Sequence, residues 1–180
     1  LCKHTVYALE VVLKTFKEKF GTYIDKMKYI NFGGGHHITR EDYDVDRLID
    51  FIKAFKQRHN NIDVYLEPGE AVGWQTGELV STVLDVFHNG MDVAILDTSA
   101  EAHMPDTLAM PYRADVRNSG EAGEKAYTYR LGGNTCLAGD IMGDYSFDTP
   151  LKIGDKIIFE DQIHYTFVKN TTFKDRKSTR

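Results

Sequence analysis

The chain has 180 residues, of which 42% are hydrophobic and 27% charged, so it can bury the core of one ordinary domain or of two small ones. Its two cysteines, Cys2 and Cys136, are too few for a disulfide-stapled secreted scaffold, and no run of about 18 apolar residues is present to cross a membrane. A net charge of −5 disfavours general nucleic-acid binding and suits a cationic partner.

The first segment has the spacing of an amphipathic helix. Apolar residues recur every three or four positions from Val6 to Phe20, with lysines between them, and Gly21 is a natural helix end. Residues 28–32 form a short apolar run that leads into Gly33-Gly34-Gly35. This order predicts a helix, then a strand, then a glycine loop.

A second helix and a second strand follow. Residues 44–58 carry apolar side chains on one helical face, with Asp44 as the expected N-cap. Asn60-Asn61 should end the helix, and residues 62–66 form a second buried strand that ends in Glu67-Pro68-Gly69. The alternation predicts βα units and a parallel sheet, although two strands are too few for a complete sheet.

The second half of the chain is richer in strand-forming segments. Residues 79–87 and 91–96 flank Asn89-Gly90, a strong signal for a β-hairpin. Residues 101–125 are expected to form a long irregular loop. Further strands are expected at residues 127–131, 156–160 and 165–168. This half is predicted to be a small barrel or sandwich.

The glycine loop is a candidate phosphate site, because glycines let backbone N–H groups close around an anion. A flexible βα turn explains the same glycines equally well. His36-His37 follow the loop and are interpreted as polar loop residues near a pocket. Adjacent histidines seldom ligate one metal ion together, so no metal site is expected.

Two further positions could carry chemistry. Glu67 ends a parallel strand, where α/β enzymes place functional groups, and it could hold a protonated ring nitrogen or a cationic substrate. The alternative is a turn with solvated acids. Cys136 lies among glycines with carboxylates nearby, which favours a partly exposed thiol over the usual buried cysteine.

These segments together resemble one family, the carboxynorspermidine/carboxyspermidine decarboxylases, which are fold type III pyridoxal-phosphate (PLP) enzymes. The resemblance covers about residues 5–173. Its Gly-Gly-Gly-His-His and Cys-Leu-Ala-Gly-Asp strings are specific to the subfamily. The matching strings are INFGGGHHIT (30–39), YLEPGE (65–70), LDTSA (96–100), HMPD (103–106), MPYR (110–113), TCLAGD (135–140) and GDYSF (143–147).

The resemblance implies a role for several residues. Gly33, Gly34, Gly35 and Tyr165 would bind the cofactor phosphate, and Glu67 would keep the pyridine nitrogen protonated. Cys136 would be the acid that returns a proton to the α-carbon after CO₂ leaves. In this family the cysteine loop comes from the opposite subunit, so the resemblance also implies a cytoplasmic homodimer with composite active sites.

Departures from related decarboxylases bear on the substrate. Glu70 stands where ornithine decarboxylases have a phosphate-contacting arginine, and Leu137 replaces an acidic residue that reads the far end of the substrate. A polycationic amino acid substrate needs carboxylates along its path. The expected substrate-binding residues are Glu70 and Asp106 first, then Asp140, Asp144 and, for a carboxylate, Arg113.

The implied fold is α/β plus all-β. Residues 1–73 would be the C-terminal part of an alanine-racemase-like (β/α)8 barrel, residues 74–173 an incomplete β-barrel or sandwich domain, and residues 174–180 a charged tail that does not match. The family's Schiff-base lysine and ring-stacking histidine would lie upstream, in a longer parent enzyme. Two alternatives stay open: a non-catalytic fragment or pseudoenzyme, and a diaminopimelate- or ornithine-type decarboxylase.

Overall fold

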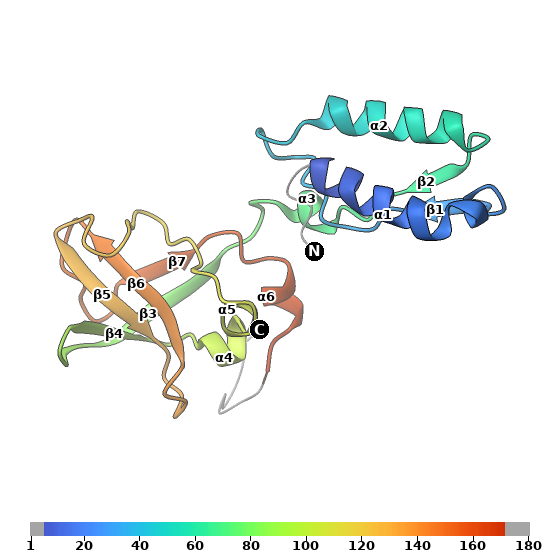
Figure 1. The fold of residues 1–180 in the computed structure, drawn as a ribbon. Helices are drawn as coiled ribbons and strands as arrows, with labels where there is room; N and C mark the ends of the chain where they lie inside the picture. The colour runs from blue at the N-terminus through green and yellow to red at the C-terminus, as the bar shows by residue number, and fades with distance from the viewer. Residues whose placement is uncertain (1–5, 172–180) are drawn as a thin grey trace. The chain divides into compact units, whose positions relative to one another are not determined.

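The computed structural model describes residues 6–171, which form two compact units with the boundary between Trp74 and Gln75 (Figure 1). The expected boundary between residues 73 and 74 falls one residue earlier. The charged tail at residues 174–180 lies outside the described residues. No helix within residues 6–171 is long and apolar enough to cross a membrane.

The first unit contains two parallel strands with helices around them. Its elements are α1 (Val6–Ile24), β1 (Tyr29–Asn31), α2 (Val45–Arg58), β2 (Asp63–Tyr65) and the short α3 (Gly69–Gly73). Strand β1 pairs with β2 in parallel, with Ile30 opposite Val64. The predicted βα alternation is confirmed, and two strands fall far short of a complete barrel.

The core of this unit forms between α1, α2 and β1. Leu9 and Leu13 of α1 are buried with Leu48 and Phe55 of α2, and the Phe55 ring meets the Phe32 ring edge-on with their centroids 5.1 Å apart. The buried residues thus fall on one stripe of each helix, as their spacing predicts.

The helix ends show what the sequence captures and what it misses. The Asp44 carboxylate accepts the Arg47 N–H at 2.9 Å, which confirms the predicted N-cap of α2. Asn60 and Asn61 adopt left-handed backbone angles, φ 53° and 56°, and end that helix as expected. Helix α1 instead continues past Gly21 to Ile24, and Phe20 is exposed, because the buried stripe includes Ile24.

The second unit is built on one five-stranded sheet in the order β6-β5-β4-β3-β7. Only the β4–β5 pair is parallel; the other pairs are antiparallel. Its elements are β3 (Leu79–His88), β4 (Asp92–Leu96), α4 (Ala100–His103), α5 (Asp106–Ala109), β5 (Tyr127–Gly132), β6 (Ile141–Phe147), β7 (Lys156–Phe159) and α6 (Tyr165–Val168). The β3–β4 hairpin at Asn89-Gly90 is confirmed.

A bulge in β3 makes this sheet curl. Residues 79–82 of β3 pair with β7, whereas residues 83–88 pair with β4, and the register shifts between Val83 and Asp85. A bulge increases the local twist of a strand and bends it. Figure 1 shows that the sheet is curled rather than flat. The expected barrel or sandwich is therefore, within the described residues, a single curled sheet.

Two expectations for this unit are wrong in detail. Residues 101–125 are not a continuous irregular loop, because they contain all of α5 and all but the first residue of α4. Ala100 and Met104 of the α4 region pack into the sheet core. Residues 165–168 form the short helix α6 rather than a strand, closed by the Lys169 N–H donating to the Tyr165 carbonyl at 2.7 Å.

Candidate functional site

The glycine loop sits directly after β1 and packs against the end of β2. Gly33 and Gly35 have positive φ angles of 73° and 78°, which favour glycine. The Glu67 N–H donates to the Gly33 carbonyl at 2.9 Å. A Cβ added to Gly34 would lie 2.8 Å from the Glu67 carbonyl oxygen. The loop therefore needs glycine for backbone conformation at two positions and for space at the third.

Asn31 ties this loop to the Glu67 side chain. Its side-chain amide donates to Glu67 Oε1 at 2.7 Å, and its side-chain oxygen accepts the Gly33 N–H at 2.7 Å. One residue thereby fixes both the first glycine and the exposed carboxylate. Sequence reasoning assigned Asn31 no role; its place two residues before the glycines was the available signal.

The two histidines after the glycines lie in a loop, as expected, and their side chains are buried. His36 and His37 are only 1% and 2% exposed. His36 Nδ1 lies 3.4 Å from the Tyr43 hydroxyl, and His37 Nδ1 lies 3.8 Å from Glu70 Oε1. The structure thus places Glu70, half-exposed, against a buried imidazole, a contact that the sequence did not predict.

Cys136 lies in the turn between β5 and β6 and is exposed, as predicted. Asp140, four residues later, is 4% exposed and faces inward. Its carboxylate accepts the Ala100 N–H at 2.7 Å, the Thr135 hydroxyl at 2.7 Å and the Thr135 N–H at 3.3 Å. Asp140 is therefore occupied by its own turn, which speaks against the expected contact with substrate.

Asp106 and Tyr165 are brought together through Lys169. The Lys169 ammonium is 2.8 Å from Asp106 Oδ1 and lies over the Tyr165 ring, 4.7 Å from its centroid. The hydrogen bond to Asp106 raises the pKa of Lys169. Sequence reasoning did not single out Lys169, because its partner is distant in the chain.

Asp144 and Arg113 also have partners within their own unit. The Arg130 guanidinium donates to both Asp144 carboxylate oxygens, at 2.7 and 2.9 Å, and lowers the pKa of Asp144. Arg113 donates to the Asp144 and Gly120 carbonyls and to Glu121, and stacks on the Tyr145 ring. The Arg130–Asp144 pair joins β5 to β6, and the Arg113 contacts fasten the sheet to the preceding loop.

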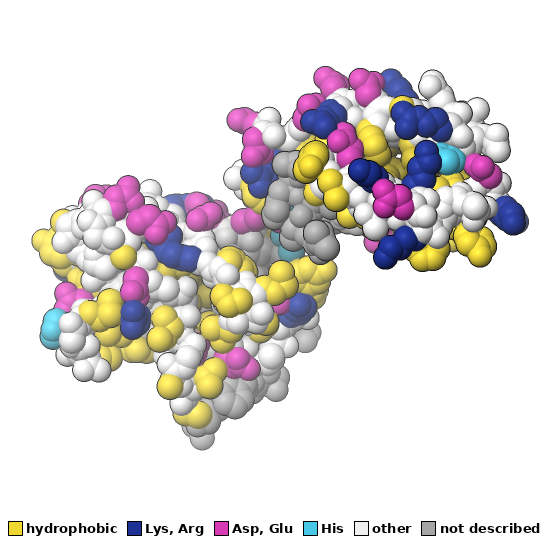
Figure 2. Space-filling view, in the orientation of Figure 1, with side chains coloured by type: hydrophobic (Ala, Val, Ile, Leu, Met, Phe, Trp, Pro, Cys, Tyr) yellow, Lys and Arg dark blue, Asp and Glu magenta, His cyan; other side chains and the backbone are white. Residues whose placement is uncertain are grey.

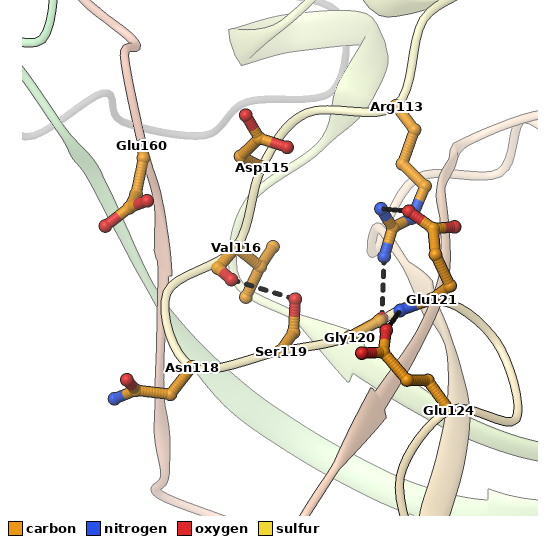
Figure 3. Close-up of a pocket in the computed structure, with 9 residues that line it drawn as sticks. All are labelled: Arg113, Asp115, Val116, Asn118, Ser119, Gly120, Glu121, Glu124 and Glu160. Atoms are coloured by element: carbon orange, nitrogen blue, oxygen red, sulfur yellow. Dashed lines mark hydrogen bonds and ion pairs between the residues drawn. The ribbon is translucent and has the colours of Figure 1, made fainter.

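Arg113 borders a polar pocket of about 350 Å³ in this unit. Figure 3 shows its guanidinium turned toward Gly120 and Glu121, while Asp115 and Glu160 lie on the opposite side. Glu160 is itself bound by Arg117 at 3.0 Å, and Glu124 accepts the Glu121 N–H at 2.7 Å. The Glu160 and Glu124 carboxylates of the pocket are thus already bound by groups of the loop that forms it. Figure 2 likewise shows acidic and basic side chains intermixed on the visible surface.

Sequence comparison shows which known proteins this chain resembles. Residues 4–162 match the family described as pyridoxal-dependent decarboxylase, C-terminal sheet domain. A carboxynorspermidine/carboxyspermidine decarboxylase of Campylobacter jejuni is 58% identical, over 96% of this chain and 48% of that protein. A carboxyaminopropylagmatine decarboxylase of Synechocystis is 48% identical, over 96% of this chain and 45% of that protein.

Solved structures agree with these sequence matches. The crystal structure of the Campylobacter jejuni carboxynorspermidine decarboxylase complexed with norspermidine is 57% identical, with a TM-score of 0.87 over 96% of this chain and 50% of that chain. An arginine decarboxylase of Paramecium bursaria Chlorella virus, bound to agmatine, shares the fold at 22% identity, with a TM-score of 0.75 over 93% of this chain and 48% of that chain. The chain spans about half the length of the curated relatives it matches.

Proposed function

The chain belongs to the pyridoxal-dependent decarboxylase family, and from this premise we propose that its full-length protein decarboxylates carboxynorspermidine and carboxyspermidine to norspermidine and spermidine. The observation that carries the proposal is the match at 57% identity to the Campylobacter jejuni enzyme solved with norspermidine. Norspermidine and spermidine are polycations, so the proposal also agrees with the acidic balance of the chain.

The residues of the first unit fit pyridoxal phosphate as the cofactor. The Gly33–Gly35 loop has positive φ angles at both ends and no space for a Cβ at Gly34, as expected of a backbone cradle for a phosphate. Glu67 presents an exposed carboxylate fixed by Asn31, which suits a protonated ring nitrogen. We assign Gly33, Gly34, Gly35 and Glu67 of this unit to cofactor binding and, from the family resemblance alone, Tyr165 of the second unit.

Pyridoxal phosphate, when bound, supplies a ring that withdraws electrons from the substrate's α-carbon as the carboxylate leaves as CO₂. The role of Glu67 is to hold the ring-nitrogen proton. The role of the Cys136 thiol, exposed at the tip of its turn, is to donate a proton to the α-carbon that lost CO₂. Glu67 thus holds a proton at the ring nitrogen, and Cys136 delivers one to the α-carbon.

Glu70 and Asp106 are the proposed contacts for the substrate's ammonium groups. Asp106 binds the ammonium group of Lys169 at 2.8 Å, an exposed side chain that a substrate ammonium group would have to displace. Glu70 is half-exposed and stands against His37. Asp140, Asp144 and Arg113 are each held by two or more hydrogen bonds within the unit, and we leave these three residues out of the proposed substrate site.

The proposal extends to the architecture of the full-length protein. Residues 1–73 would belong to a (β/α)8 barrel and residues 74–173 to the sheet domain. The active enzyme would be a cytoplasmic homodimer in which Cys136 is delivered to the partner's cofactor. The parallel β1–β2 pair and the exposure of Cys136 support these two points.

A second substrate is favoured by one finding. The Synechocystis relative, at 48% identity over the same share of this chain, is a carboxyaminopropylagmatine decarboxylase. That substrate ends in a guanidinium group rather than an ammonium group, and carboxylates bind both. The two candidates therefore differ at the far end of the substrate and share the decarboxylated centre.

The test is a substrate panel assayed with the full-length protein loaded with pyridoxal phosphate. Carboxynorspermidine and carboxyspermidine should give the highest kcat/KM values, and these should lie within about 10- to 200-fold of each other, because one methylene group separates the two. A higher kcat/KM for carboxyaminopropylagmatine would favour the second candidate. Turnover of diaminopimelate or ornithine alone would contradict both.

A further inference from the structure

The turn that carries Cys136 is organised around the buried carboxylate of Asp140. Strand β5 ends at Gly132 and β6 begins at Ile141, and the intervening residues carry the thiol at their exposed tip. The Gly133 N–H donates to the Asp140 carbonyl at 2.8 Å and closes the base of the turn. The thiol's position therefore depends on whatever fixes residues 133–139.

The Asp140 side chain reaches the residue next to the cysteine. It accepts both the hydroxyl and the N–H of Thr135, and the Thr135 hydroxyl oxygen in turn accepts the Leu137 N–H at 3.3 Å. The residues before and after Cys136 are thus held by one hydrogen-bonded unit. Two bonds to one carboxylate restrict the turn more than a single contact would.

The same carboxylate anchors the turn to the body of the second unit. Its other oxygen accepts the Ala100 N–H at 2.7 Å, and Ala100 is fully buried in the sheet core. Gly133 makes room for this arrangement, because a Cβ there would clash with the Asp140 carboxylate. Buried carboxylates are costly to desolvate unless donors surround them, as they do here.

We propose that Asp140 is a positioning residue for Cys136: it holds the turn so that the thiol is presented for proton transfer. This inference rests on the proposed function only in what the thiol does. A proton donor must lie within hydrogen-bond reach of its target, and displacement by about 1 Å can reduce the rate about 100-fold. Asp140 acts through the turn and does not itself meet substrate.

The test compares four variants of the full-length protein with pyridoxal phosphate bound. Asp140→Asn weakens the acceptor, and Thr135→Val removes the hydroxyl at a half-buried position, so it should fold even if Asp140→Asn does not. Thr135→Ser restores the hydroxyl. Thr128→Val is the matched control, because it removes a β5 hydroxyl that accepts the Gly123 N–H at 3.0 Å and has no part in the Cys136 turn.

Two readouts are taken: kcat and KM for carboxynorspermidine, and the rate of Cys136 alkylation by iodoacetamide, followed by peptide mass spectrometry. Asp140→Asn and Thr135→Val should lower kcat about tenfold or more with KM within about threefold, and should change the alkylation rate by about threefold or more. Thr135→Ser should recover most of both values. Thr128→Val should change neither.

Unchanged kcat and unchanged alkylation in Asp140→Asn and Thr135→Val would overturn the proposal. A fall in thermal stability alone, with both readouts unchanged, would overturn it as well, because Asp140 would then only stabilise the fold. If the unmodified protein does not decarboxylate the substrate, the proposed function fails instead, and the alkylation rates still test the positioning of Cys136.

Discussion

The two units carry their candidate residues in different ways. In the first unit, Asn31, Gly33 and Glu67 lie at the ends of two adjacent strands and are joined by hydrogen bonds of 2.7–2.9 Å. In the second, most candidate carboxylates bind partners within the unit, and Cys136 stands exposed at the tip of a turn. A site made by the backbone can be recognised from a contiguous motif. A site made by side chains depends on which of them are already hydrogen-bonded or ion-paired within the fold, and a motif does not show this.

The largest expected effect tests whether the second unit supplies proton transfer while the first unit binds the cofactor. Cys136→Ala in the full-length protein should lower kcat about 100- to 10,000-fold, because a positioned general acid contributes about that much. Bound pyridoxal phosphate, measured by its absorbance, should stay at the unmodified level. Loss of the cofactor in this variant would break the division between the two units.

A smaller effect is expected from the backbone of the first unit. Gly34→Ala places a Cβ 2.8 Å from the Glu67 carbonyl, a backbone atom that cannot rotate away. We expect pyridoxal phosphate affinity to fall about tenfold or more, which corresponds to about 1.4 kcal/mol, as measured by equilibrium titration.

Gly69→Ala is the matched control for this substitution. A Cβ at Gly69 meets no atom within 4 Å, so its affinity for pyridoxal phosphate should match that of the unmodified protein. Equal losses in the two variants would show that the glycine loop is not a close-fitting cradle.

Asn31→Ala tests whether one side chain organises the loop and Glu67 together. The substitution removes two hydrogen bonds, each worth about 0.5–1.5 kcal/mol net, at exposed positions. We expect pyridoxal phosphate affinity to fall a fewfold, less than in Gly34→Ala, and the melting temperature to fall by a few degrees. An affinity equal to that of the unmodified protein would mean that the backbone alone sets the loop.

The smallest expected effect concerns the ion pair of Asp144 with Arg130. The guanidinium lowers the pKa of Asp144 below its ordinary value of 3.8, so the ionised carboxylate stabilises the fold above that pH. The contribution should be lost as the pH falls through the lowered pKa. Both side chains are part-exposed, so Asp144→Asn should cost about 1 kcal/mol or less.

Urea unfolding of the Asp144→Asn variant and of the unmodified protein, at neutral and at acid pH, measures this contribution. The difference in unfolding free energy should shrink toward zero at acid pH. A difference that grows at acid pH would contradict the assigned role of Arg130.

The sequence predicted the parts of the fold and of the candidate site that are local in the chain. The glycine loop, Glu67 at the end of β2 and the Asp44 cap each depend on residues a few positions apart or on strand ends that a parallel pair brings together. Cys136 in an exposed turn follows from its neighbouring glycines. These predictions hold because local sequence preference and tertiary structure favour the same conformation at these positions.

The parts that could not be predicted depend on long-range contacts. Asp140 faces inward and accepts a hydrogen bond from Ala100, which is 40 residues away in sequence. Asp106 is bound by Lys169, which is 63 residues away. Residues 165–168 have strand-forming side chains but form a helix, because local hydrogen bonds close the turn and its side chains stay exposed. Composition cannot show which carboxylates the fold has already paired.

The account's central claim is that the full-length protein replaces the carboxylate of a carboxylated polyamine with a proton. The most direct measurement is mass spectrometry of the product formed from carboxynorspermidine in heavy water, after exchangeable deuterons are washed out. The account predicts norspermidine with a single deuterium on the carbon that lost CO₂. Recovery of unchanged substrate, or of a product that keeps its carboxylate, would contradict it.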